Sequence, residues 1–162
     1  MSAGAYLLAR FTDPEQLLPA VKLLDSLQPI IRWDAVDGHV HLVIKTKPAA
    51  TPDAIKSLIG LDELLRYDIV DNGDTGAIFD PSLSYAYVFI EAEACRRESV
   101  RESIAALSET HFCSATTGGC DVVAVIRGPR FSAVENTIAE KIRSLEGVLR
   151  LKHDRIIDLR QL

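Results

Sequence analysis

The sequence lacks the features that mark membrane-spanning, secreted or nucleic-acid-binding proteins. No apolar run approaches the roughly 18 residues of a membrane-spanning helix, and no basic segment precedes an apolar one at the N-terminus. With 18 Lys and Arg residues against 23 Asp and Glu, the net charge is -5, which provides no basic footprint for DNA or an anionic membrane. These absences predict a cytoplasmic protein that binds neither nucleic acid directly nor membrane.

Cysteine is also scarce, and its pattern excludes a disulfide framework. The three cysteines, Cys95, Cys113 and Cys120, are odd in number and have no C-x-x-C spacing. They are expected to be reduced, half-buried small hydrophobic residues. His111, Cys113 and Cys120 are an alternative set of soft metal ligands, but we predict no metal and no cofactor.

Motifs for nucleophilic catalysis and phosphate binding are missing as well. The sequence has no G-x-S-x-G, and the glycines of Thr116 to Gly119 precede a predicted strand rather than a helix, so they do not form a P-loop. No catalytic residue is predicted from these motifs.

What is present is a βαββαβ order of elements in the second half, organised around the turn Thr116 to Asp121. Paired glycines favour a turn with positive φ, and Asp121 can hydrogen-bond the turn's own amides. This order is that of the ferredoxin-like fold. The expected elements are strands at Tyr85 to Ala92, Phe112 to Thr116, Asp121 to Ile126 and Leu149 to Leu159, and helices at Glu98 to Leu107 and Ser132 to Leu145.

The first half predicts the same order. A helix begins at Thr12 to Glu15, with proline in its first turn, and places Leu17, Val21 and Leu24 on one stripe. Asp37 and Gly38 are expected to form a two-residue hairpin turn. The strands are expected at Ala5 to Phe11, Ile30 to Val36, His39 to Lys45 and Leu64 to Val70, with Pro29 ending the first helix and a second helix running from Thr51 to Leu58.

Glycine and tyrosine positions repeat between the halves. Tyr6 and Tyr87 lie 81 positions apart, as do Gly38 and Gly119, whereas Gly60 and Gly147 lie 87 apart because the second half has the longer helix. We therefore predict an internal duplication: residues 1–71 form a first ferredoxin-like domain, 72–84 a linker, and 85–162 a second domain.

Both predicted sheets are apolar on both faces, which indicates that they pack against each other. Burial of apolar surface is favourable by about 25 cal/mol per Å². The predicted fold class is therefore α+β, with two tandem ferredoxin-like domains forming a pseudo-dimeric α/β barrel-like sandwich. Self-association of two such chains is also expected.

The second half resembles a known family. The Thr-Gly-Gly-Cys-Asp turn, the run Asp121 to Ile126, and the spaced Ile138, Ile142, Leu145, Gly147 and Val148 are similar to the ligand-binding (RAM) domain of the Lrp/AsnC amino-acid-responsive regulators. The resemblance covers Tyr85 to Leu162 and implies an amino-acid effector held at this turn between subunits. Family regulators usually begin with a helix-turn-helix, which this sequence does not have. Cys120 replaces the bulky residue that precedes the family's aspartate, so the resemblance does not give the effector's identity.

Two groups of residues are candidates for ligand binding. Thr116, Thr117, Gly118, Gly119 and Asp121 can offer backbone amides to a carboxylate and an acidic side chain to an ammonium group, although a plain turn is the alternative. The corresponding first-half turn, Asp37, Gly38 and His39, is a degenerate candidate that lacks the threonines and the second glycine.

The leading functional hypothesis is a stand-alone Lrp/AsnC-type effector-binding protein that senses an amino acid or similar metabolite. It would act as a homo-oligomer or together with a DNA-binding relative. The alternative is an enzyme of the dimeric ferredoxin-like barrel group, an oxygenase, isomerase or tetrapyrrole decarboxylase, that uses His39, His41 or His111. His39 and His41 would share a strand face, where solvated histidines are the competing interpretation. A purely structural oligomerisation module is the third hypothesis.

Overall fold

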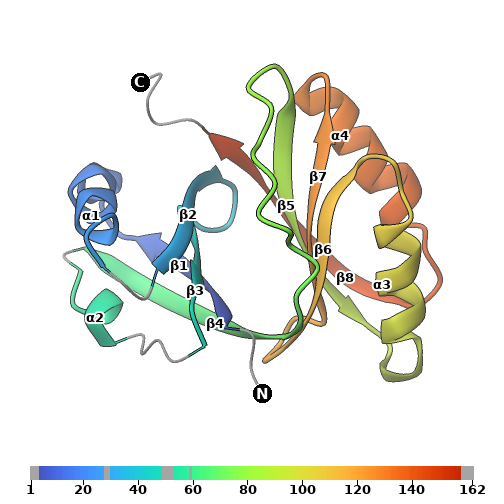
Figure 1. The fold of residues 1–162 in the computed structure, drawn as a ribbon, viewed down its shortest axis with the longest axis horizontal. Coiled ribbons are helices and arrows are strands. Elements are labelled where there is room, and N and C mark those ends of the chain that lie inside the picture. The colour runs from blue at the N-terminus through green and yellow to red at the C-terminus, as the bar shows by residue number, and fades with distance from the viewer. Residues whose placement is uncertain (1–3, 28–29, 49–52, 59, 158–162) are drawn as a thin grey trace.

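The strands of this protein close into one barrel (Figure 1). The computed structural model describes residues 4–27, 30–48, 53–58 and 60–157. Within these ranges the order around the barrel is β1-β3-β2-β8-β5-β7-β6-β4, with β4 paired back to β1 and every neighbouring pair antiparallel. The strands are β1 (Ala5–Phe11), β2 (Ile30–Asp37), β3 (Leu42–Thr46), β4 (Leu61–Asp71), β5 (Ser84–Ala92), β6 (Thr110–Thr117), β7 (Val122–Gly128) and β8 (Val148–Ile157).

Helices lie outside the barrel on two opposite sides. Figure 1 shows α1 (Leu17–Leu24) and α2 (Asp53–Lys56) on one side and α3 (Arg97–Ala105) and α4 (Phe131–Thr137) on the other. A π-helical segment, Ile138–Ile142, continues α4, and the two together cover most of the helix predicted from Ser132 to Leu145. None of the helices in the described ranges is long and apolar enough to cross a membrane.

Each half of the barrel has the ferredoxin-like strand order, which confirms the predicted fold class. The first half reads β4-β1-β3-β2 and the second β8-β5-β7-β6. The halves meet at two short seams: β2 pairs with β8 from Ala35 to Asp37, and β4 pairs with β6 from Asp68 to Asp71. Three predicted element ends lie outside the described residues: the end of the first helix at Pro29, the start of the second helix at Thr51 and Pro52, and the end of the last strand at Leu159.

Strand alternation produces three apolar cores. Tyr6, Leu8 and Tyr87 point into the barrel, where they pack with residues of both halves. The alternate residues, such as Leu7 and Val88, point outward and pack beneath the helices of their own half. The inner core therefore depends on both halves, as the apolar sheet faces predicted.

The predicted two-residue turn at Asp37 and Gly38 is wrong. The strand β2 ends at Asp37 and β3 begins only at Leu42, and the backbone N–H of Val36 donates to the carbonyl oxygen of His41 at 2.9 Å. Gly38 is not among the glycines with positive φ, whereas a two-residue type I′ turn requires positive φ at both central positions. The chain instead uses a wider connection.

The second hairpin has the same form, and this changes one predicted correspondence. Thr116 N–H donates to the Asp121 carbonyl oxygen at 2.9 Å, in the same pattern as Val36 and His41. Ala35 pairs with Leu42 in the first hairpin, and Ala115 pairs with Val122 in the second, so equivalent residues of the two hairpins are 80 positions apart in the sequence. Gly38 therefore matches Gly118 rather than Gly119.

The other two predicted pairs, Tyr6 with Tyr87 and Gly60 with Gly147, are consistent with equivalent hydrogen bonds in the two halves. Gly60 accepts the Thr12 N–H at 2.9 Å and Gly147 accepts the Glu93 N–H at 2.8 Å, and both glycines have positive φ. The structural repeat supports duplication, which remains a prediction about the origin of the chain.

Candidate functional site: a pocket at the second hairpin

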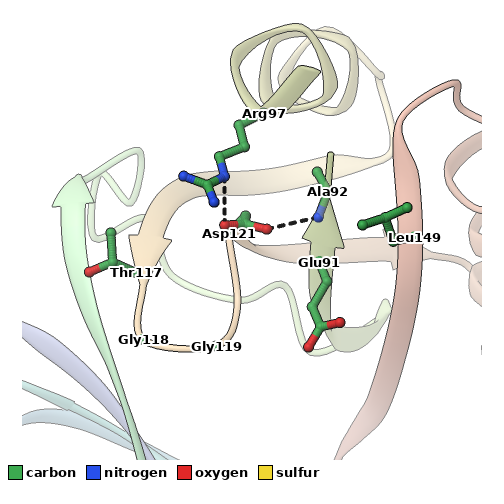
Figure 2. A pocket seen from close by; sticks show the side chains of 8 residues that line it. All are labelled: Glu91, Ala92, Arg97, Thr117, Gly118, Gly119, Asp121 and Leu149. Carbon is green, nitrogen blue, oxygen red and sulfur yellow. Dashed lines mark hydrogen bonds and ion pairs between the residues drawn. The ribbon is translucent and has the colours of Figure 1, made fainter. Parts of the chain in front are cut away.

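A pocket of about 320 Å³ lies beside the Gly118 and Gly119 turn. Four segments build it: the end of β5, the start of α3, the β6 to β7 connection, and the start of β8 (Figure 2). It is lined by Glu91, Ala92, Arg97, Thr117, Gly118, Gly119, Asp121 and Leu149.

The turn itself requires glycine. Gly118 and Gly119 have φ values of 105° and 116°, in a region that residues with a Cβ rarely adopt. A Cβ on Gly118 would also lie 3.0 Å from the carbonyl oxygen of Arg66 on β4, so the turn packs closely on the first half. The ring of Tyr67 lies beside Gly119, and burial is the main cause that raises the pKa of Tyr67. The pocket wall therefore rests on a residue of the other half.

Asp121 is held in place by β5 and α3 rather than by the turn amides. Its Oδ2 accepts the backbone N–H of Ala92 at 2.8 Å, and its Oδ1 pairs with Nε of Arg97 at 2.9 Å (Figure 2). The Asp121 side chain is 17% exposed and that of Arg97 57% exposed. The terminal nitrogens of Arg97 make no hydrogen bond or ion pair with any described residue, so they remain available to an acidic ligand. Figure 2 shows Glu91 pointing away from this pair.

Some of the predicted site residues line the pocket and others do not. Thr117, Gly118, Gly119 and Asp121 line the pocket together. Thr116 does not line it, because its side chain is buried and its hydroxyl donates to the Cys120 carbonyl oxygen at 2.9 Å.

Asp37, Gly38 and His39 lie at the first hairpin, away from the pocket lining. The His39 backbone N–H donates to Oδ1 of Asp154 at 2.6 Å, and the His39 Nδ1 lies 2.8 Å from Oδ2 of the same carboxylate. Asp154 is fully buried, and a Cβ on Gly38 would overlap its carboxylate. The Asp154 carboxylate therefore fills the space at this turn.

His41 stands at the first-half position that Asp121 has in the second half. Its Nδ1 accepts the backbone N–H of Phe11 at 2.9 Å, as Asp121 accepts that of Ala92. The first half thus lacks a carboxylate at this position. The expected shared face of His39 and His41 is not formed, since His39 contacts Asp154 and the Phe89 ring.

The predicted soft ligands are also separated. Cys113 packs beneath the helices of the second half, whereas Cys120 packs inside the barrel. Burial raises the pKa of Cys113 to about 12 and that of Cys120 to about 11. No group of three or more His, Cys, Asp or Glu side chains that could hold a metal occurs in the described part of the chain.

Four of the pocket-lining residues were not predicted from the sequence: Glu91, Ala92, Arg97 and Leu149. Arg97 was not recognised as a site residue, because its partner Asp121 is 24 positions away in the sequence. The helix start next to the end of β5 is the local signal that places Arg97 near Asp121.

Residues 85–157 match the family model of the Lrp/AsnC ligand binding domain. The second half is therefore similar to the Lrp/AsnC ligand binding domain. All eight pocket-lining residues fall within the matched range. No curated protein matches the chain at a significant level.

Solved structures of low identity share the fold over most of the chain. The siroheme decarboxylase NirDL has a TM-score of 0.76 at 10% identity, covering 95% of this chain and 71% of that one. A putative monooxygenase from Fusobacterium nucleatum has a TM-score of 0.52 at 9% identity, covering 96% of this chain and 93% of that one.

A further solved structure matches only part of the chain. The protein TTHA0845 from Thermus thermophilus is 28% identical, and the match covers 46% of this chain and 94% of that one, with a TM-score of 0.45.

Proposed function

We propose that this protein is an effector-binding regulatory protein and that the pocket at the Gly118 and Gly119 turn binds a small carboxylate, such as an amino acid. The observation that carries the proposal is the pairing of Arg97 with Asp121 at a glycine turn, inside the range that matches the Lrp/AsnC ligand binding domain. Each contact of an amino acid has a chemically suitable partner there.

The carboxylate of the ligand would bind the terminal nitrogens of Arg97. A guanidinium offers parallel N–H donors that match the two oxygens of a carboxylate. The amides of the glycine turn would add donors without side-chain obstruction. The ammonium group would bind Asp121, whose carboxylate is already oriented by Ala92 and Arg97.

We further propose that each chain binds one effector. The first-half counterpart of Asp121 is His41, and the first hairpin is filled by the contact between His39 and Asp154. Duplication into domains 1–71 and 85–162, joined by 72–84, would then have left one working site. A regulatory role would require a homo-oligomer or a DNA-binding relative as partner.

Calorimetric titration with the twenty standard amino acids tests the proposal. At least one is expected to bind, with one site per chain. Arg97→Gln removes a charge-assisted contact worth about 1.5–3 kcal/mol, so affinity falls by about tenfold to about 100-fold. Asp121→Asn keeps the side-chain shape and weakens binding through the lost charge.

Arg96→Gln is the matched control. Arg96 neighbours Arg97 in the sequence, pairs with Glu146 at 2.9 Å, and does not line the pocket. Affinity unchanged in this control but lost in Arg97→Gln supports the proposal. Equal affinity in all variants would place the ligand elsewhere.

A barrel enzyme is the second candidate, and the His39 and Asp154 pair favours it. A buried carboxylate at Nδ1 leaves Nε2 of His39 as the possible acid or base. The other two histidines are less suited, since His41 Nδ1 accepts the Phe11 N–H and His111 Nε2 lies 3.0 Å from the Ala77 carbonyl oxygen. Tetrapyrrole binding by the purified protein that is lost in His39→Gln would favour the enzyme.

A further inference from the structure

A group of buried and half-buried ionisable side chains lies inside the barrel, away from the pocket. Arg32 and Asp34, two positions apart on β2, share the inward face, and Arg32 Nε lies 3.2 Å from Oδ2 of Asp34. The Tyr87 hydroxyl donates to Asp34 at 2.6 Å and accepts from Arg32 at 2.9 Å. Lys45 on β3 is 5% exposed, and its Nζ lies 5.8 Å from the centre of the Tyr6 ring.

The segment that connects the halves, residues 72–83, inserts into this group. Figure 1 shows it, in green, running between β2 and β6. Oδ2 of Asp74 lies 3.0 Å from Lys45 Nζ and 3.3 Å from Arg32 Nη1, and the Asp74 side chain is only 3% exposed. Asn72 contributes a second acceptor to Lys45 at 3.1 Å.

An aromatic side chain of the same segment lies beside the Arg32 guanidinium. The Phe79 ring is stacked on Tyr85 with 4.4 Å between centroids. The guanidinium of Arg32 lies 5.4 Å from the centroids of both Phe79 and Phe112. The connecting segment thus presents a carboxylate and a flat apolar ring to the same arginine.

Charge balance shows that the barrel strands alone form an incomplete group. Arg32 and Lys45 are two cations, whereas the strands supply one carboxylate, Asp34, which is paired with Arg32. Asp74 of the connecting segment is the one acidic partner of Lys45 among the described residues. A buried ion without a partner is strongly unfavourable. The barrel strands therefore offer a binding position for a carboxylate between Arg32 and Lys45, and Asp74 of the connecting segment occupies it.

A buried hydroxyl lies in the same place. The Tyr6 hydroxyl is fully buried, and the Ser114 side chain is its hydrogen-bonding neighbour. Ser114 Oγ also accepts the Gly73 N–H of the connecting segment at 3.1 Å, so this hydroxyl can donate to a ligand that takes the place of the segment.

We propose that Arg32, Lys45 and Tyr6 form a second ligand site, for a carboxylate carried on an aromatic or planar body, and that Asp74 and Phe79 fill this site in the protein without ligand. The ligand carboxylate replaces that of Asp74 between the two cations, and its ring takes the place of Phe79 against Arg32. This site is independent of the pocket at Gly118 and Gly119.

Exchange requires the connecting segment to leave the barrel, which breaks the Asp74 ion pairs, the Phe79 ring contacts and the contact of His111 with the Ala77 carbonyl oxygen, together with two backbone hydrogen bonds. Gly73 N–H donates to Oγ of Ser114 at 3.1 Å, and Asp80 N–H donates to the Tyr85 hydroxyl at 2.7 Å. Ile78 is 92% exposed, so its outer side is uncovered. If the segment is seated in about 99% of molecules, its removal raises apparent ligand affinity about 100-fold.

Benzoate is the probe, because it combines a carboxylate with a ring. Its affinity is measured by calorimetry on the full chain carrying Asp74→Ala with Phe79→Ala, and on the wild type. We expect benzoate to bind the double variant at least about tenfold more tightly. Benzamide, which has the ring without the charge, is expected not to bind.

Two control variants make the result specific. Asp80→Ala alters the same segment at an exposed carboxylate that contacts Ser82, and it is expected to leave benzoate affinity at the wild-type value. Lys45→Met in the double variant is expected to abolish binding, whereas Arg97→Gln in the double variant is not. Should the double variant fail to fold, Asp74→Asn keeps the side-chain shape and replaces it.

Benzoate affinity that is equal in wild type and in the Asp74 variants would overturn the proposal. Tighter binding that survives Lys45→Met would overturn it too, because the ligand would then lie outside the barrel site. Loss of binding with Arg97→Gln would assign benzoate to the pocket and has the same consequence.

Discussion

The Tyr87 hydroxyl is the most informative single group in the barrel interior. It donates to Asp34 at 2.6 Å and accepts from Arg32 at 2.9 Å, and Tyr87 is 1% exposed. Burial, and then the charge of Asp34, raise the pKa of Tyr87 well above its ordinary value, so the hydroxyl keeps its proton. Tyr87→Phe removes two hydrogen bonds to charged partners while the ring stays in place.

The expected loss can be estimated from those two bonds. Hydrogen bonds to charged groups contribute about 1.5–3 kcal/mol each, but Arg32 and Asp34 remain paired after the substitution, so we expect a loss of about 3 kcal/mol in unfolding free energy. For a chain of this size that corresponds to a fall of roughly 6–12 °C in Tm. Urea unfolding monitored by circular dichroism measures it.

Tyr67→Phe is the control, because the Tyr67 hydroxyl makes no hydrogen bond with any described residue. A loss for Tyr87→Phe within about 1 kcal/mol of the control would refute the reasoning, since the network would then contribute nothing beyond ring packing.

Three further predictions concern the thiols, the acid dependence and the turn. In the native protein, Ellman's reagent is expected to label only Cys95 rapidly at pH 8, and all three cysteines in denaturant, because Cys113 and Cys120 are buried with raised pKa values; rapid labelling of more than one would contradict the burial. Desolvation alone would raise the pKa of Asp74, but its hydrogen bonds with the Gly76 N–H and Lys45 lower that pKa overall. The ionised carboxylate therefore stabilises the fold above the unfolded pKa of about 3.9, and this stabilisation is lost as the pH falls further. Urea unfolding should show the stability gap between wild type and Asp74→Asn shrinking from about pH 5 to about pH 2, and a constant gap would refute this. Gly118→Ala is expected to cost about 1–3 kcal/mol in urea unfolding, more than Gly76→Ala, because both glycines have positive φ but only a Cβ on Gly118 meets a backbone atom, the Arg66 carbonyl oxygen at 3.0 Å.

The fold was predictable from the sequence because local patterns repeat. The alternation in Ala5 to Phe11 and in Tyr85 to Ala92 specifies strands with two apolar faces, and each face finds a core in the barrel. The wider connection at Gly38, in place of the predicted two-residue turn, was not predictable, because a contact with Asp154, 116 positions away, decides that backbone.

The candidate site was predictable only in its backbone. Gly118, Gly119 and Asp121 are neighbours in the sequence, so their turn could be recognised. Leu149 reaches the pocket through tertiary packing, which leaves no local signal, and the one local signal for Arg97 is the helix start next to the end of β5. The same holds for Asp74, whose partners Arg32 and Lys45 lie on strands of the first half while its own segment has the composition of a linker.

The central claim is that the second hairpin alone holds the effector. Backbone amide chemical shifts, followed by NMR while an amino acid that raises the Tm is added, test it residue by residue. We expect saturable shifts at Thr117, Gly118, Gly119 and Asp121 and none of comparable size at Gly38. Shifts at Gly38 that match those of the second hairpin, or an unperturbed second hairpin, would contradict it.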